Sequence, residues 1–100
     1  MSLRTVKTDN MGVVANPDKP GCAALVERAI RHLGALGRRV VVDGPTAGLV
    51  TAAAAVVPTL QELARQVDVL LVVGGDGTML RVARELAGMP TPILGINAGS

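Results

Sequence analysis

The stretch VDVLLVVGGDGT, residues 67–78, decides the fold. Its first seven residues are nearly all apolar and mostly branched, which is typical of a strand buried on both faces of a parallel sheet. Three glycines in four positions follow at once, and a helical pattern begins near Thr78. The order strand, glycine-rich loop, helix predicts one unit of an α/β domain. Its loop lies at the carboxyl end of the strand, where ligands bind in such sheets.

The alternation of strands and helices continues outward from this stretch in both directions. We predict four strands, at residues 11–15, 39–42, 67–73 and 92–96. Apolar spacing predicts a helix over residues 22–36, whereas residues 46–66, rich in Ala and Leu and broken by Pro58, predict two short helical pieces. Strands that alternate with helices pair in parallel, so the loops that follow them share one rim of the sheet.

Each of the two longer helices has an apolar face. In the first, the residues expected to face the core are Cys22, Leu25, Val26, Ala29, Ile30, Leu33 and Leu36. In the helix after the glycine-rich loop they are Leu80, Ala83, Leu86 and Ala87, with Arg81, Arg84 and Glu85 toward solvent. His32 falls on the polar face of the first helix and is expected at the surface, while Cys22 is expected to be a buried small residue.

Composition narrows the function classes. The formal charge is only +2 and the chain has no Phe, Tyr or Trp, so it lacks both the basic stripe and the stacking platforms of a nucleic-acid-binding protein. No apolar run approaches the roughly 20 residues that a membrane span needs, so no membrane partner is expected. The single cysteine rules out an internal disulfide, which makes a cytoplasmic location the default.

The glycine-rich loop carries the chemistry. Its glycines allow positive backbone dihedrals and remove side chains that would hold a phosphate away, and the helix that follows adds free amides and the positive end of its dipole. Asp76 is unusual in such a loop, because a carboxylate repels a phosphate. Either Asp76 caps the helix, or it meets a metal ion or a hydroxyl. Thr78 could share the capping and leave Asp76 free for chemistry.

Other motifs fit this loop poorly. The dinucleotide pattern G-x-G-x-x-G would need glycine where Leu80 stands, and the Walker sequence Gly-Lys-Ser/Thr is absent. With serine only at positions 2 and 100 and one histidine, a Ser-His-Asp site is not expected.

Three segments together resemble the NAD kinase family, over residues 11–100. They are Gly74-Gly75-Asp76-Gly77-Thr78-Met79-Leu80 with its preceding strand, Gly95-Ile96-Asn97-Ala98-Gly99, and Gly12-Val13-Val14-Ala15-Asn16-Pro17 with Lys19-Pro20. Diacylglycerol and sphingosine kinases and phosphofructokinases carry similar GGDG loops. The lipid kinases, however, usually have glutamate at the position of Arg81, and they lack the Gly-Ile-Asn segment.

The resemblance implies a Rossmann-like three-layer α/β domain with a parallel sheet over residues 11–100, the N-terminal domain of an NAD kinase. Residues 1–10 would form a tail, part of which can derive from cloning, and a C-terminal domain would be absent. The implied reaction transfers a phosphoryl group from ATP or polyphosphate to the adenosine ribose 2′-hydroxyl of NAD, which gives NADP. A divalent metal, Mg or Mn, would assist. The full-length protein is expected to be a homo-oligomer, and this chain alone is expected to be inactive.

The resemblance also assigns residues. Asp76 would be catalytic, either as a base for the 2′-hydroxyl or by orienting it. The residues implied to bind the nucleotides are Gly74, Gly75, Asp76, Gly77, Thr78, Arg81 and Asn97. Arg81 has a second interpretation, an exposed ion pair with Glu85 one turn along the helix. Two other functions stay open: a non-catalytic nucleotide-binding or interaction module, and a lipid kinase domain of the diacylglycerol or sphingosine type.

Overall fold

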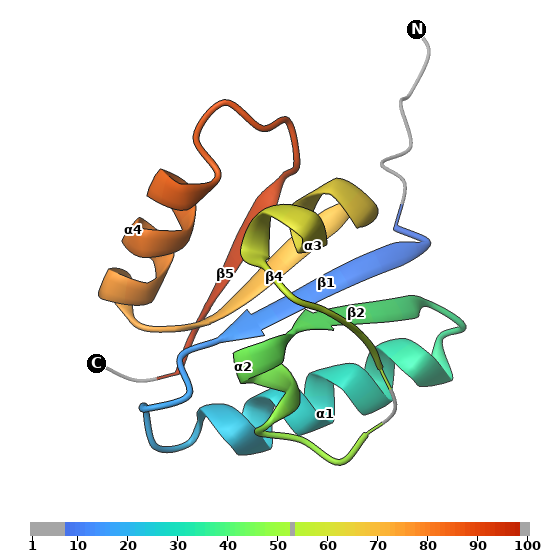
Figure 1. The fold of residues 1–100 in the computed structure, drawn as a ribbon. Coiled ribbons are helices and arrows are strands. Elements are labelled where there is room, and N and C mark those ends of the chain that lie inside the picture. Colours follow the sequence, from blue (N-terminus) through green and yellow to red (C-terminus); the bar gives the residue numbers. More distant parts are fainter. Residues whose placement is uncertain (1–7, 53, 99–100) are drawn as a thin grey trace, which may run out of the picture.

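Five parallel strands form the centre of the molecule (Figure 1). The computed structural model describes residues 8–52 and 54–98. The strands are β1 (Asn10–Ala15), β2 (Arg39–Asp43), β3 (Ala55–Val57), β4 (Val69–Gly74) and β5 (Ile93–Asn97), in the order β3-β2-β1-β4-β5. Most of the tail predicted over residues 1–10 lies outside the described residues. The predicted α/β class with a parallel sheet is confirmed.

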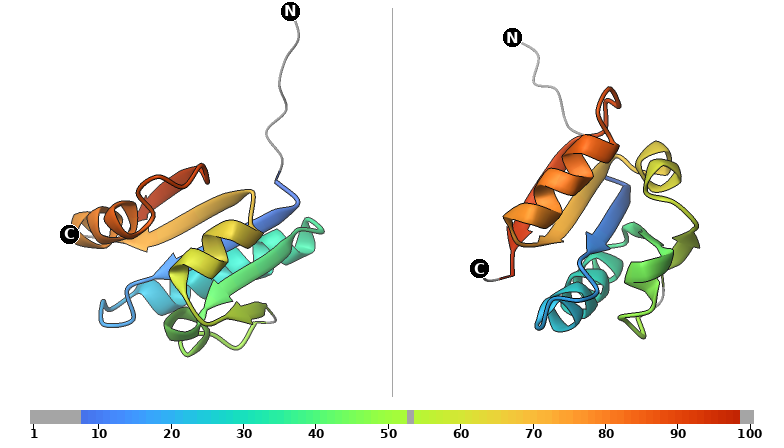
Figure 2. Two further views of the ribbon diagram at one scale, coloured as in Figure 1. Left: turned by 45° about the horizontal axis from the view of Figure 1, so that its top comes forward. Right: turned by 60° about the vertical axis from the view of Figure 1, so that its left-hand side comes forward.

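Helices cover both faces of this sheet, so the domain has three layers (Figure 2). They are α1 (Cys22–Ala35), α2 (Gly44–Ala47), α3 (Leu60–Gln66) and α4 (Asp76–Glu85). Adjacent residues of β1 point to opposite faces: Val13 packs with the buried residues of α1, and Val14 packs with those of α3 and α4. Alternation of this kind fixes which strand residues meet which helix.

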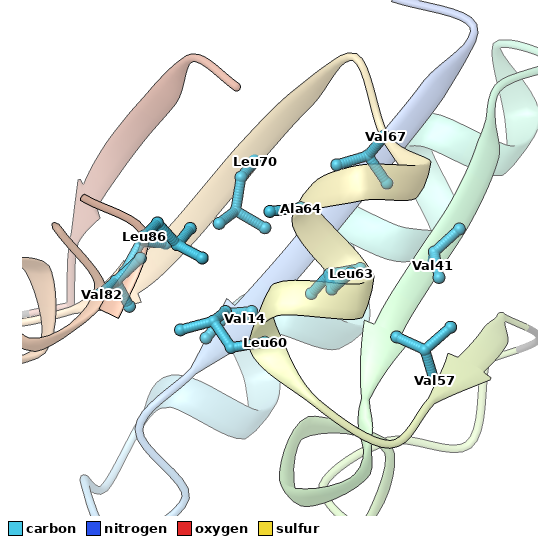
Figure 3. Packing of buried hydrophobic residues seen from close by; sticks show 11 residues of the cluster. Val14, Val41, Val57, Leu60, Leu63, Ala64, Val67, Leu70, Val82 and Leu86 are labelled. Carbon is cyan, nitrogen blue, oxygen red and sulfur yellow. The ribbon is translucent and has the colours of Figure 1, made fainter. Parts of the chain in front are cut away.

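Both core clusters are aliphatic. On the side of α3 and α4, Leu63 and Leu70 are fully buried between helix and sheet (Figure 3). On the opposite side, Val26 and Ile30 of α1 are buried, and Cys22 is fully buried as predicted. Burial of each large side chain stabilises the fold by about 1.5–3 kcal/mol. The two packed clusters therefore support the rim of the sheet that carries the loops.

The prediction of two helical pieces over residues 46–66 is partly wrong. The segment contains α3, but it also contains a fifth strand, β3, while α2 starts earlier, at Gly44. β3 has only three residues and pairs in parallel with β2, with Val42 opposite Val56. Its sequence, Ala-Val-Val, follows a run of alanines and is too short to show a strand period, so the strand is recognised by its backbone pairing with β2.

The predicted inner face of the last long helix is correct at Leu86 but wrong at Leu80, Ala83 and Ala87. Buried positions along α4 are Thr78 and Val82, and Leu86 just beyond it is buried too, whereas Leu80 is 54% exposed. Ala83 and Ala87 are exposed as well. α4 begins at Asp76, two residues earlier than expected, and packing of Thr78 against the end of β4 sets the rotation of the helix. A smaller error is Leu36, which follows α1 and is 57% exposed.

Candidate functional site

A cleft of about 530 Å³ lies at the rim where β1 and β4 end. One wall is the loop after β1, and the other is the start of α4; Figure 1 shows both strands running toward this rim. The lining residues are Asn16, Lys19, Gly75, Asp76, Gly77, Thr78 and Arg81. The structure thus brings most of the predicted site residues together.

The loop after β4 is very short. Gly74 ends the strand, Gly75 is extended with φ −99° and ψ −170°, and α4 starts at Asp76. No side chain of the described residues caps this helix, so neither proposed cap, Asp76 or Thr78, is formed. The first intrahelical bond from the loop runs from the Met79 amide to the Gly75 carbonyl, at 3.2 Å. The amides before Met79 are therefore left to face the cleft or solvent, with the positive end of the helix dipole behind them.

The loop glycines do not serve the predicted backbone role. Among the described residues, positive φ occurs at Gly21, Gly37 and Gly88, none of which lies in the loop. At Gly74 the reason for glycine is packing, because a Cβ would lie 2.7 Å from Oγ1 and 2.8 Å from Cβ of Thr78. At Gly77 a Cβ would meet nothing within 4 Å. Glycine at position 74 therefore lets α4 approach β4, and glycine at position 77 leaves the start of the helix accessible.

Asp76 and Thr78 differ sharply in exposure. Asp76 is exposed in the first turn of α4 and lines the cleft. Thr78 also lines the cleft, but it is 7% exposed, with its side chain against Gly74. Asp76 is therefore the acidic group that a ligand in this cleft would meet first.

Arg81 forms the predicted ion pair with Glu85 and also lines the cleft. Its Nη1 lies 3.0 Å from Oε2 of Glu85, so the exposed ion pair predicted from the i, i+4 spacing is present. Arg81 also lines the cleft, one turn beyond Gly77. The pair with Glu85 does not remove it from the cleft, and its contact with a phosphate stays a prediction.

Sequence reasoning placed the Asn16 loop on this rim but missed Lys19 as a site residue. The Asn16 side chain accepts a hydrogen bond from the Asp18 amide at 3.0 Å, and the Asn16 carbonyl accepts one from the Lys19 amide at 3.2 Å. This turn holds Lys19 at the cleft. The signal in the sequence was the Asn-Pro-Asp turn directly before a basic residue. With Lys19 and Arg81, the cleft has two cations around the carboxylate of Asp76.

Two predicted residues lie outside the lining of this cleft. Gly74 belongs to β4 and is buried. Asn97, at the end of β5, is opposite Gly74 in the sheet, and the next amide, of Ala98, donates to the Gly74 carbonyl at 3.0 Å. Asn97 is thus next to the loop but not on the wall of the cleft. Gly99, the last residue of the segment that supported the resemblance, lies outside the described residues.

A second hollow lies on the face of the sheet that α1 covers, between α1 and β5. This α1–β5 groove has a volume of about 680 Å³ and is lined by Leu25, Arg28, Ala29, Arg31, His32 and Ile96. It has cations but no carboxylate in its lining, and His32 is exposed, as predicted. The groove offers attraction for an anion but no carboxylate that could orient a hydroxyl.

The described residues contain no group of three or more His, Cys, Asp or Glu side chains arranged to hold a metal ion. None of the described helices has the length and apolar character needed to cross a membrane.

Comparison with known proteins gives consistent matches. A family model, that of the ATP-NAD kinase N-terminal domain, matches residues 11–100. Relatives named NAD kinase from Acinetobacter baylyi and Burkholderia cenocepacia are 38% and 37% identical, over 90% and 94% of this chain. The chain spans only 29% and 33% of those relatives. The crystal structure of yeast NADH kinase complexed with NADH matches 93% of this chain and 30% of its own, with a TM-score of 0.77 and 19% identity, which supports the fold.

Proposed function

The chain belongs to the NAD kinase family, and from this premise we propose that its cleft binds phosphate groups and holds the acceptor hydroxyl in transfer from ATP to NAD. The product would be NADP, phosphorylated at the adenosine ribose 2′-hydroxyl. Polyphosphate is a second possible donor. Because the chain spans about a third of its relatives, we assign it one part of the active site, and we expect the complete reaction only in a longer protein.

One observation carries this proposal: an exposed carboxylate, Asp76, stands at the open start of a helix in a cleft with two cations. A site that only bound phosphate would gain from the absence of that carboxylate, since like charges repel. A site that must also align a hydroxyl with a phosphate gains from its presence. Asp76 would accept a hydrogen bond from the 2′-hydroxyl, orient its oxygen toward the phosphorus, and take the proton late in a loose transition state.

The surrounding groups would hold the phosphates. The backbone amides of Gly77 and Thr78 lie in the first turn of α4, where the helix has no carbonyl to accept from them, and the helix dipole adds partial positive charge there. Lys19 and Arg81 would balance the charge of the phosphates from the two walls of the cleft. Charge stabilisation of this kind supplies much of the catalysis in phosphoryl transfer, where the protein has little covalent chemistry to do.

The family implies a divalent metal, and the residues fit one that arrives with the nucleotide. Asp76 is the one carboxylate in the cleft lining, and Mg²⁺ is commonly bound by one or two carboxylates together with substrate phosphates. When bound, the metal would offset negative charge on the phosphates. We propose Asp76 as its ligand from this chain.

Other parts of the assignment stay proposals. The yeast relative was solved with NADH, which supports a nicotinamide nucleotide as ligand here. Homo-oligomer formation by the full-length protein and a cytoplasmic location are predictions carried over from the sequence. The family match favours the kinase over a non-catalytic module, and it favours NAD over a lipid as acceptor.

Substitution of Asp76 by Asn in the full-length protein tests this function. We expect turnover of NAD to NADP to fall by at least about a hundredfold, the scale expected of acid–base or hydroxyl-orienting groups, with little change in melting temperature. Asp9→Asn is the matched control, since Asp9 is an exposed carboxylate next to the start of β1, at the end of the sheet away from the cleft. Near-wild-type turnover in Asp76→Asn would reject the catalytic assignment.

A further inference from the structure

The end of β1 has strand support on one side only. Its pairing with β4 continues to Ala15 opposite Val73, and the Asn16 amide donates to the Val73 carbonyl. Its pairing with β2 runs only to Val13 opposite Val42, because the chain turns into α2 after Asp43. Ala15 is 2% exposed, so its amide needs a partner that β2 no longer provides.

Thr46 supplies that partner. Its Oγ1 accepts a hydrogen bond from the Ala15 amide at 3.1 Å, and the side chain is fully buried. The Thr46 amide in turn donates to Oδ1 of Asp43 at 3.1 Å, which caps the short helix α2. Two buried hydrogen bonds therefore join the end of β2 to the end of β1.

We propose that Thr46 is a positioning residue for the wall of the cleft formed by Asn16 and Lys19. This inference rests on the proposed function of the cleft. Asn16 follows Ala15 directly, and its carbonyl and side chain form the turn that holds Lys19. Loss of the Thr46 hydroxyl leaves a buried amide without a partner, so the backbone at residues 15–16 shifts toward another acceptor. Lys19 then moves relative to the fixed start of α4.

A purely structural role is the alternative, and the chain offers a matched control for it. Thr91 also uses its hydroxyl in a partly buried backbone contact, donating to the Ala64 carbonyl at 2.7 Å. Thr91 precedes β5, so it lies at the end of the sheet away from the cleft. Removal of either hydroxyl lowers stability, but only that of Thr46 removes a hydrogen bond to Ala15, the residue directly before the cleft wall.

The test compares Thr46→Val, Thr46→Ser and Thr91→Val in the full-length protein. Thr46→Val should raise the KM for ATP about tenfold, the scale of one weakened hydrogen bond to a charged group, with a smaller change in kcat. Thr46→Ser keeps the hydroxyl and should restore the wild-type KM. Thr91→Val should lower the melting temperature and leave KM unchanged. An unchanged KM in Thr46→Val, or an equal rise in Thr91→Val, would overturn the proposal.

Amide hydrogen exchange separates this inference from the proposed function, since it needs no turnover. In Thr46→Val, exchange should speed up at Ala15 and across the turn to Lys19, and stay unchanged in the first turns of α4. If exchange at residues 15–19 is unaffected, Thr46 does not set this wall. A wild-type protein without kinase activity would contradict the proposed function, while the exchange result would still decide the role of Thr46.

Discussion

At the scale of single residues, Gly74 and Gly77 of the same loop have different structural roles. Gly74 lies under Thr78, so a methyl group there collides with a buried side chain at 2.7–2.8 Å. Gly77 faces open space at the start of α4. Sequence inspection treats both as parts of one phosphate loop, because the letters carry no information about which glycine faces the helix and which faces the ligand.

This difference predicts opposite outcomes for two alanine substitutions. Gly74→Ala should lower the free energy of unfolding by about 1–3 kcal/mol, the usual cost of overpacking. Gly77→Ala should leave stability equal or raise it by up to about 1 kcal/mol, because alanine is the better helix former, yet it should weaken nucleotide binding by placing a methyl group beside the open amides. Urea denaturation and the KM for ATP measure the two effects. Strong destabilisation by Gly77→Ala would show that its surroundings are not open.

Also at this scale, Asp76 was predictable and Lys19 was not. A carboxylate among glycines is visible in the sequence as an anomaly that requires a chemical reason. Lys19 is one of several cations in the first half of the chain, and only the turn at Asn16 distinguishes it. No local sequence pattern predicts the hydrogen bond of Thr46, because its partner Ala15 lies 31 positions away in the sequence.

At the scale of elements, β3 and the connection before it depend on a contact with α1. The Glu27 carboxylate accepts hydrogen bonds from the Thr51 amide at 2.8 Å, the Thr51 hydroxyl at 2.9 Å and the Ala52 amide at 2.8 Å. These hydrogen bonds, first that from the Thr51 backbone, lower the pKa of Glu27 from its ordinary value of 4.5, with Arg31 adding to the effect. No local pattern in residues 46–59 predicts the hydrogen bonds to Glu27. This is one reason why the sequence did not predict the fifth strand.

The lowered pKa predicts how stability changes with pH. Because the folded protein binds the Glu27 proton less tightly than the unfolded chain does, the stabilisation is fully present above pH 4.5 and is lost as the pH falls through the lower folded value. Glu27→Gln should therefore be less stable than wild type at pH 7, and the difference should shrink below pH 4.5. Urea denaturation from pH 7 to pH 3 measures it. A difference that stays constant with pH would show that the charge of Glu27 does not stabilise this connection.

Helix α4 shows the limit of periodicity for a short element. Its sequence offers apolar residues on several sides, so the choice between a face with Leu80 and a face with Val82 depends on where the helix begins. That point is fixed by contact between Gly74 and Thr78. The register of a helix directly after a strand is thus a tertiary property, whereas the existence of the helix follows from its residues.

At the scale of the whole molecule, the alternation of strands and helices was sufficient to predict the α/β class and the shared rim. Parallel pairing brings the loops after β1 and β4 together even though 58 positions separate Asn16 from Gly74, because β1 and β4 are neighbours. The number of strands could not be counted correctly, since β3 at the edge owes its form to β2. The rim of the cleft follows from this topology, whereas the place of Lys19 in the cleft depends on the hydrogen bonds of the turn at Asn16.

The most direct test of the central claim, that this cleft binds nucleotide phosphates, is an NMR titration of the 15N-labelled chain with ATP and Mg²⁺. We predict that the largest amide shift changes occur at residues 75–78 and 16–19, on the two walls of the cleft, and that inorganic sulfate at equal ionic strength does not reproduce them. The α1–β5 groove, with Arg28, Arg31 and His32, is the internal comparison, because it also attracts anions. Shift changes that are largest in that groove, with none at residues 75–78, would contradict the account.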